Sequence, residues 1–405
     1  MSHPSQPGDA ARSGATLRRQ SAIKFVVLTG IVSLFADATY EGARSITGPF
    51  LQVLGAGGAA VGFVAGFGEL IGYGLRLASG YLADRTHRYW LVTAIGYCVN
   101  VLAVPLLALA GNWETAACLM VMERAGKAIR TPPRDAMLSH ATSQTGHGWG
   151  FGLHEALDQI GAVMGPLLVA FVLVRKHSYP AAFGWLLLPA ILTLSFLAIS
   201  AWLYPNPQKF EIPHTLPSKE NFPRRYWVYL AGAALIGAGY ADFPLIAFHL
   251  QKMKIAQQSW IPLLYAMAMG IDAIAALICG RFFDRIGIKA LIAAVVLSAF
   301  FAPFAFLGKL GGVVFGLILW GIGMGAQESI MRAAIAQMVP PEKRASAYGI
   351  FHFIFGICWF AGSALMGVLY DVSIPALIAF SVAAQLCALP FLYKAVDRSN
   401  PATLR

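Results

Sequence analysis

The chain has 405 residues, of which 58% are hydrophobic and only 12% are charged, and its mean hydropathy is +0.64. Soluble domains are about half apolar and a quarter charged, so this composition excludes a soluble globular protein and indicates an integral membrane protein. The formal net charge of +11 comes from basic residues spread over many loops. No RNA- or DNA-binding motif accompanies them, which argues against a nucleic-acid partner.

The apolar residues fall into stretches of the length that a helix needs to cross a bilayer, about 20 residues. Only helices or closed barrels can span, and continuous apolar runs such as VVFGLILWGIGM (313–324) lack the alternation of barrel strands. The predicted structure is therefore all-α. In chain order we predict twelve spans, at about 24–44, 58–83, 89–110, 114–137, 148–174, 180–203, 226–250, 258–282, 289–308, 312–337, 345–370 and 375–393.

The polar segments divide the chain. Residues 1–22 carry no apolar stretch followed by a cleavage site, so they predict a disordered tail before an uncleaved signal anchor. The segment PNPQKFEIPHTLPSKENFPRR (205–225) is rich in proline and charge and predicts a linker. We therefore expect an N-terminal six-helix bundle at 23–204, a C-terminal one at 226–395 and a second tail at 396–405.

Lysine and arginine are concentrated in the loops that share one side if both termini are cytoplasmic. The expected location is the cytoplasmic (inner) membrane, with several passes and with both tails and the linker in the cytoplasm. The five cysteines lie in apolar spans without C-x-x-C spacing, which predicts neither disulfides nor a metal site.

Two short segments repeat about two hundred residues apart. GYLADRTHR begins at residue 80 and GRFFDRIGIK at residue 280, each between the second and third helices of its half. The matching residues are Gly80, Asp84, Arg85 and Arg88 in the first copy and Gly280, Asp284 and Arg285 in the second. Such a correspondence is typical of an internal repeat.

These segments resemble the loop signature G-x-x-x-D-R-x-G of the major facilitator superfamily, although His87 replaces one glycine and Lys289 lies one place late. The resemblance covers about residues 24–395. It implies twelve transmembrane helices in two pseudo-symmetric six-helix bundles, and a secondary transporter whose central cavity opens alternately to either side. It also implies a gating role for the seven repeat residues, which would latch the second helix against the eleventh, and Arg134 is expected to join them.

A second resemblance lies in the fifth helix. GLHEALDQIGAVMGPLLVA (152–170) has the spacing G-x8-G-x3-G-P, which is similar to a motif of drug:proton antiporters, with Val169 and Ala170 in place of its closing glycines. The alternative is a simple Gly-Pro bend. The segment IRTPPRDA (129–136) resembles a set of bacterial permeases of the same superfamily, without indicating a substrate.

Charged residues inside the spans are the candidate functional groups. Each costs at least about 2.5–3.5 kcal/mol at bilayer depth, so we expect it to face a water-filled cavity or a partner. A carboxylate that changes neighbours as the bundles move could carry a proton, and the alternative is a permanent ion pair. The proton-coupling candidates are Asp37, Glu41, Glu69, Glu155 and Asp158.

A further set of residues is expected to line the substrate cavity. Arg44, Arg76, Lys127 and Arg130 could bind an anionic group, provided that nearby acids do not neutralise them. The other candidates are polar or aromatic residues at similar depth: Tyr40, Tyr73, His154, Tyr240, Asp242, Trp320, Gln327, Glu328 and Trp359.

The predicted function is proton-coupled export of a small organic solute by antiport. The alternative is proton-coupled uptake of an organic anion by symport. The sequence has no H-E-x-x-H, G-x-S-x-G or G-x-x-x-x-G-K-[ST] motif, so neither an enzyme nor an ATP-driven pump is predicted. The expected partners are a small-molecule substrate, protons and the lipid bilayer, with a monomeric protein and without a cofactor or metal.

Overall fold

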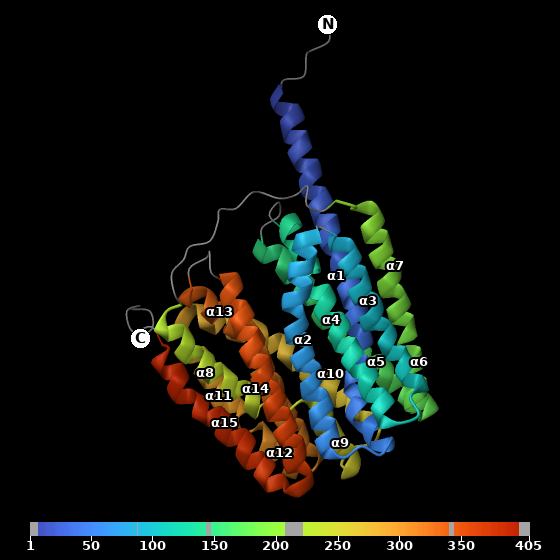
Figure 1. Ribbon diagram of the computed structural model, residues 1–405, viewed down its shortest axis with the longest axis vertical. Coiled ribbons are helices and arrows are strands. Elements are labelled where there is room, and N and C mark those ends of the chain that lie inside the picture. The colour runs from blue at the N-terminus through green and yellow to red at the C-terminus, as the bar shows by residue number, and fades with distance from the viewer. Residues whose placement is uncertain (1–6, 87, 143–146, 207–221, 340–343, 397–405) are drawn as a thin grey trace.

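The computed structural model describes residues 7–86, 88–142, 147–206, 222–339 and 344–396, and within them it is helical throughout, without a strand (Figure 1). Helix α1 begins at Pro7, so residues 7–22, which were expected in a disordered tail, continue the first helix. Residues 1–6, most of the linker (207–221) and the C-terminal tail from 397 lie outside the described residues.

The elements follow the two predicted bundles. The first contains α1 (Pro7–Val53), α2 (Gly58–Thr86), α3 (Tyr89–Leu106) with the short η1 (Leu107–Leu109), α4 (Trp113–Thr142), α5 (His147–Lys176), α6 (Tyr179–Trp185) and α7 (Leu187–Leu203). The second contains α8 (Arg224–Gly239), α9 (Phe243–Lys252), α10 (Trp260–Ile286), α11 (Lys289–Ser298), α12 (Phe301–Leu307), α13 (Leu310–Met338), α14 (Arg344–Val372) and α15 (Ile374–Lys394).

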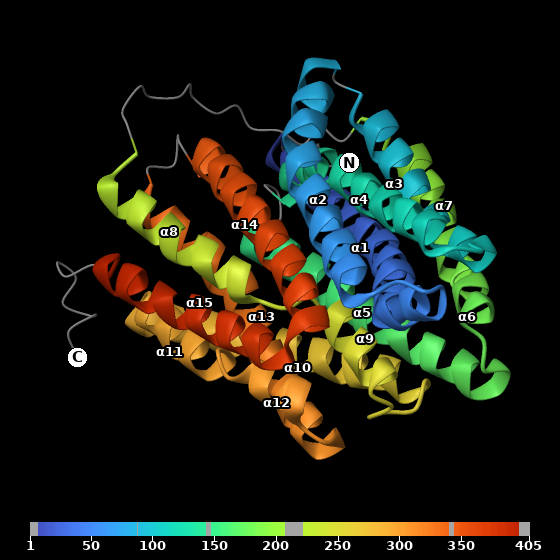
Figure 2. The same cartoon turned by 60° about the horizontal axis from the view of Figure 1, so that its bottom comes forward.

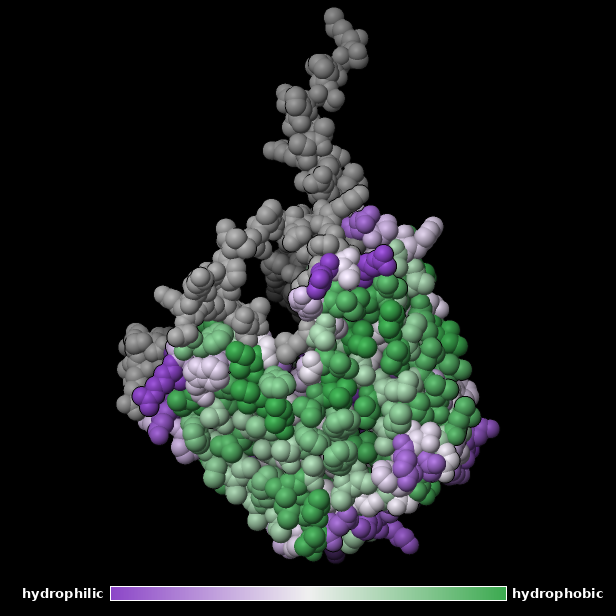
Figure 3. All heavy atoms as spheres, viewed as in Figure 1, coloured by the Kyte–Doolittle hydropathy of each residue, from purple (hydrophilic) through white to green (hydrophobic). Residues whose placement is uncertain are grey.

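Eleven helical stretches of the described chain are long and apolar enough to cross a membrane. The remaining predicted span is α4, which has sufficient length but carries many charged residues between Glu114 and Asp135. It packs within the first bundle, against α2 and α3. On the face seen in Figure 3, apolar side chains cover the body of the molecule and polar ones lie towards its two ends. The predicted all-α membrane fold is therefore confirmed.

The seventh predicted span is broken near its middle, between α8 and α9. Tyr240 and Asp242 have extended backbone, with ψ angles of 113° and 142°. Pro244 favours this break, because proline fits the first turn of a new helix and cannot continue the preceding one. Asp242 makes no cap hydrogen bond to α9, and its carboxylate is free to turn towards the first bundle.

The two bundles meet mainly through the contacts of α2 with α14, α5 with α10, and α1 with α9, and smaller contacts join α2 to α9 and α1 to α10. Close packing requires glycine at Gly62, where an added Cβ would lie 2.7 Å from the Cα of Gly367. We call the α9 side of the molecule the closed end, since the start of α2 and the end of α14 also meet there. The opposite side, from which α1 projects, is the tail end, and there the bundles diverge (Figures 1 and 2).

Candidate transport cavity

A cavity of about 600 Å³ lies between the two bundles and is lined by α1, α2, α4 and α5 on one side and α10, α13 and α14 on the other. Its walls extend to Arg134, Arg332 and Tyr348 towards the tail end. The volume is in the usual range of sites for small organic ligands, about 300–1,000 Å³.

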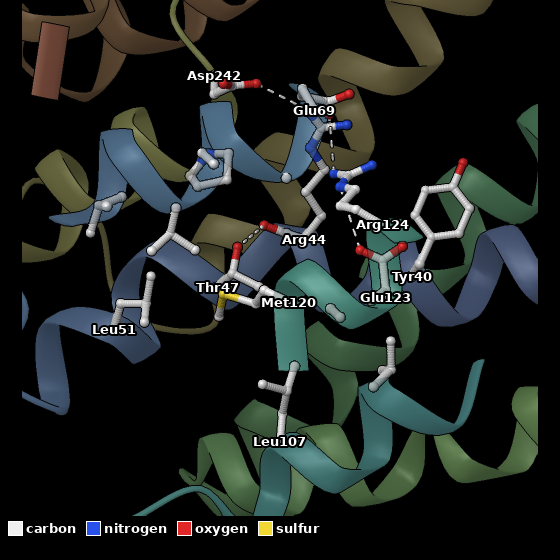
Figure 4. Close-up of a pocket in the computed structure, with 17 residues that line it drawn as sticks. Tyr40, Arg44, Thr47, Leu51, Glu69, Leu107, Met120, Glu123, Arg124 and Asp242 are labelled. Atoms are coloured by element: carbon white, nitrogen blue, oxygen red, sulfur yellow. Dashed lines mark hydrogen bonds and ion pairs between the residues drawn. The ribbon is translucent and has the colours of Figure 1, made fainter. Parts of the chain in front are cut away.

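Arg44 of α1 is the centre of a buried ionic network at the deep end of this cavity (Figure 4). Its Nη2 lies 3.3 Å from Glu69 Oε1 on α2 and 3.2 Å from Asp242 Oδ1 at the α8–α9 break. Its Nη1 lies 3.9 Å from Glu41 Oε1. The Asp242 pair connects the two bundles.

The second oxygen of Asp242 is held within the C-terminal bundle. The indole N–H of Trp359 donates to Oδ2 at 2.9 Å, and the hydroxyl of Ser363 donates to the same atom at 2.7 Å. Only 2% of Asp242 is exposed. A buried carboxylate needs partners of this kind, because desolvation of the charge is otherwise costly.

The network continues into α4 and α3. The Nη2 of Arg124 lies 3.4 Å from Glu69, and its Nε lies 3.4 Å from Glu123. Asn100 donates to the Glu123 carboxylate at 2.9 Å. Glu69, Glu123, Arg124 and Asp242 line a second, smaller cavity of about 40 Å³, on whose apolar side Figure 4 shows Met120 and Leu107. Glu123 thus pairs with Arg124, the next residue along α4.

A second polar cluster follows α1 towards the tail end. The hydroxyl of Tyr40 donates to Asp37 Oδ2 at 3.2 Å, and Nη2 of Arg130 lies 3.4 Å from Asp37 Oδ1. Arg130 also lies over the ring of Tyr97, with 4.5 Å between its Cζ and the ring centroid. Lys127 donates to the Tyr40 hydroxyl. This cluster holds α1 against α4 within the first bundle.

Three further contacts complete the polar lining. The hydroxyl of Tyr265 on α10 donates to the Glu41 carboxylate and forms a second connection between the bundles. Arg134 pairs with Asp135 at 2.8 Å. The imidazole of His154 lies 3.3 Å from Asp158, one turn further along α5.

Some charged groups of the lining have no ion-pair partner within 4.0 Å in the described part of the chain. On the acidic side these are Glu155 of α5, Asp272 of α10 and Glu328 of α13. On the basic side two of them are Arg76 of α2 and Lys127 of α4. The lining groups without an ion-pair partner therefore include both acids and bases.

Comparisons with known proteins agree with this architecture. The family model of the Major Facilitator Superfamily matches residues 26–363 and, in a second match, 243–405. The chain belongs to this superfamily. It is 43% identical to an uncharacterized protein of Mycobacterium tuberculosis over 95% of this chain and 97% of that protein. It is 25% identical to an uncharacterized MFS-type transporter of Methanocaldococcus jannaschii, over 86% of this chain and 89% of that one.

A solved structure shares the fold. The crystal structure of the nucleoside transporter NupG superposes with a TM-score of 0.72 at 15% identity, covering 91% of this chain and 98% of that one. The predicted membership of the Major Facilitator Superfamily and the predicted secondary transport are therefore confirmed. The protein is a multi-pass membrane transporter.

Most of the candidate site residues predicted from the sequence line the larger cavity. They are Asp37, Tyr40, Glu41, Arg44, Glu69, Tyr73, Arg76, Lys127, Arg130, Arg134, Glu155, Asp158, Gln327, Glu328 and Trp359. Four others lie behind its wall. Asp242 lines the smaller cavity, His154 is buried beside Asp158, and Tyr240 and Trp320 pack together in the C-terminal bundle.

Several charged lining residues were not among the sequence candidates, and Arg124 and Asp272 are two of them. Arg124 follows Glu123 in the sequence and forms ion pairs with both Glu69 and Glu123. Asp272 is a lone carboxylate in the apolar run AMAMGIDAIAA (266–276), and this isolation was a signal that the sequence offered.

The predicted gating residues lie at the tail end, where the bundles are apart. Arg85, Arg88, Asp284 and Arg285 are exposed, and Arg85 donates to Tyr81 within its own helix at 3.2 Å. A Cβ on Gly80 would touch only Pro132 of the same bundle, and one on Gly280 would meet nothing within 4 Å. The side chain of Asp84 lies outside the described residues. The latch therefore remains a prediction for a state in which this end is closed.

Proposed function

We propose that the protein exports a small organic solute across the cytoplasmic membrane in exchange for protons, with both termini in the cytoplasm. The observation that carries the proposal is the set of carboxylates without basic partners in the cavity: Glu155, Asp272 and Glu328. They line the wall formed by α5, α10 and α13, and α5 and α10 belong to different bundles in contact.

Pairing separates these acids from the other proton-coupling candidates. Asp37, Glu41 and Glu69 each lie within 4.0 Å of an arginine, and Asp158 is next to His154. A carboxylate fixed in a buried ion pair is costly to protonate, because its partner is then left uncompensated. Among the five candidates, Glu155 is thus favoured as a proton carrier. Asp272 and Glu328 join it, and the four paired acids are assigned to holding helices in register.

The side from which the solute is proposed to enter follows from the end towards which the cavity extends. The cavity extends to the tail end, and the predicted orientation places this end in the cytoplasm, because basic loop residues gather there. A solute would then enter from the cytoplasm and displace protons from the unpaired carboxylates. Rocking of the bundles would expose the same groups to the other face, where protons would displace the solute.

A second candidate is proton-coupled uptake of an organic anion. It is favoured by Arg76 and Lys127, which line the cavity and remain without a carboxylate partner in the described residues. Arginine binds carboxylates and phosphates with two parallel hydrogen bonds and suits such a solute.

The test uses purified full-length protein in liposomes with a pH-sensitive dye inside. Compounds that raise its melting temperature in a screen of metabolites and antibiotics are added one by one. We expect compound-dependent proton flux of the sign of antiport. The exchanges Glu155→Gln, Asp272→Asn and Glu328→Gln should each reduce the flux, and one of them should uncouple it. The control is Glu114→Gln, an exposed acid at the start of α4 outside the cavity lining.

Three outcomes separate the alternatives. Flux of the opposite sign indicates symport. Compound movement that persists after the proton gradient has been collapsed contradicts proton coupling. Full coupling in all three variants removes these carboxylates from the proton role and leaves the transporter assignment unchanged.

A further inference from the structure

We infer that the transported solute is amphoteric, with a cationic group held by Asp272 and its acidic neighbours and an anionic group held by Arg76 and Lys127. The inference rests on the proposed transport function and deepens it by naming the chemical class of the substrate. It follows from where the unpaired charges lie in the cavity: Arg76 beside the contact of α2 with α14, and Asp272 and Glu155 beside the contact of α5 with α10.

The acidic wall presents a carboxylate that lacks a partner. Asp272 is only 2% exposed, lines the cavity, and its Oδ1 has no hydrogen-bond partner among the described residues. Glu328 and Glu155 lie within electrostatic range of it. Arg332, one turn beyond Glu328, turns its guanidinium to the Glu328 backbone carbonyl. A buried, unpaired acid destabilises the empty protein, and a bound cationic group would satisfy it.

The basic wall presents donors held by aromatic rings. The Cζ of Arg76 lies 5.1 Å from the ring centroid of Tyr73, and its Nε is buried without a hydrogen-bond partner in the described chain. Tyr73 stacks in turn on His352 of α14, with 5.5 Å between ring centroids. The Nζ of Lys127 lies 3.8 Å from the ring centroid of Tyr40. Aromatic faces orient both cations and leave donors available for an anionic group.

The two walls belong to different contacts between the bundles. Arg76 lies beside the contact of α2 with α14, whereas Asp272 and Glu155 lie beside the contact of α5 with α10. Figure 1 shows α2 and α14 in front, with α5 and α10 behind them. Met269, Met324 and Phe355 also line the cavity. Methionine side chains adapt to irregular apolar shapes, so these residues suit an apolar spacer between two charged groups.

The overall charge of the lining supports the same class. Eight carboxylates and seven lysines and arginines line the cavity, so their formal charges almost cancel. A solute with a single charge would satisfy one wall and leave the other unmatched. A solute with both charges satisfies the two walls together and adds little net charge.

The experiment uses matched probes that differ only in charge. 6-Aminohexanoate carries both groups, 6-acetamidohexanoate only the anion, and 6-aminohexanamide only the cation. Equivalent sets with three to ten carbons vary the spacer. Binding to the full-length protein in detergent is measured by thermal shift and by isothermal titration. We expect one spacer length at which the amphoteric probe binds roughly tenfold or more tightly than either singly charged relative, since each charge-assisted bond is lost separately.

Two variants assign the groups to the walls. Asp272→Asn should reduce the affinity of the amphoteric probe to that of the anion-only probe, whose own affinity should not change. Arg76→Gln should reduce it to that of the cation-only probe. If either protein is unstable, Glu328→Gln and Lys127→Gln replace them. The controls are Glu114→Gln and Arg281→Gln, which change exposed charges outside the lining.

The possible results distinguish the inference from the proposed function. Equal binding of an amphoteric probe and one singly charged relative overturns the inference, as does the absence of amphoteric binding at every spacer length. A singly charged compound that drives proton flux in liposomes sinks the inference and keeps the proposed function. Binding of an amphoteric probe without proton flux supports the inference and contradicts the proposed proton coupling.

Discussion

Asp242 illustrates how one residue can serve both bundles. It lies at the break between α8 and α9, where its carboxylate reaches Arg44 of the first bundle and Trp359 and Ser363 of the second. The break supplies this geometry, because a carboxylate in the middle of a continuous helix would have only neighbours one turn away. The ionic contact between the bundles is therefore made at a point where the backbone has left the helix.

Replacing Asp242 should destabilise the protein, because it removes one acid from the ionic network around Arg44. In Asp242→Asn, Arg44 keeps Glu41 and Glu69 but loses its contact with the second bundle, and loss of a hydrogen bond between charged groups costs about 1.5–3 kcal/mol. We expect a lower melting temperature for the purified protein. Arg44→Gln should do the same, and the double variant should lose less than the sum of the two, since each single variant already removes the contact between them. Additive losses would show that the two residues do not interact.

At the scale of elements, the contact between α2 and α14 depends on small residues at the closed end. Gly62 and Gly367 let the two backbones approach, in the way that small residues do throughout membrane helix pairs. Further along α2, Tyr73 still packs against Gly356 and His352 of α14, whereas a Cβ added at Gly74 would meet nothing within 4 Å. The same helix thus has glycines in the tight contact and glycines that face open space.

Gly62 and Gly74 should respond differently to the same substitution. In Gly62→Ala the added Cβ meets the backbone of Gly367, which cannot yield as a side chain can, so we expect a lower melting temperature and slower transport. Gly74→Ala is the matched control in the same helix and should leave both unchanged or raise stability by up to about 1 kcal/mol. Equal effects of the two exchanges would contradict a tight contact at Gly62.

The bundles also meet through a helix terminus. Asp371 at the end of α14 accepts hydrogen bonds from the backbone N–H groups of Gly58 and Ala59, at 3.1 and 2.8 Å, and so caps α2 of the other bundle. The carboxylate also lies 3.8 Å from Lys252. Opening of the closed end must break this cap, because it joins residues of the two bundles.

Removal of the cap should therefore favour the open form of that end. Loss of an N-cap acceptor costs about 1 kcal/mol, which would increase the population of that form about fivefold in Asp371→Ala. The measurement is the labelling rate of Thr47→Cys by an impermeant maleimide in a background without the five native cysteines. Lys252→Gln, which keeps the cap, is the control and should label close to the parent rate. An unchanged rate in Asp371→Ala would show that the cap does not restrain opening.

At the scale of the whole molecule, the sequence predicted the twelve spans, because bilayer-length apolar runs give the strongest signal in a membrane protein. It did not predict that four of these runs contain a break or change of helix type, as between α8 and α9. The cavity residues could be proposed from their charge alone. Their pairing could not, since Arg44 and Asp242 are 198 positions apart, and contacts of this kind depend on how the bundles sit together.

The crowding of ionised groups on α4 has a consequence for biosynthesis. A segment that contains Glu123, Arg124, Lys127 and Arg130 is too costly to enter lipid unaided, at about 2.5–3.5 kcal/mol for each ionised residue. Glu69 and Asp37, which pair with Arg124 and Arg130, reside on α2 and α1, and these helices leave the ribosome earlier. The newly made chain must consequently retain its first helices beside the insertion machinery until α4 arrives. Variants that lack Asp37 or Glu69 should then be degraded during synthesis, before any assay of transport could detect them.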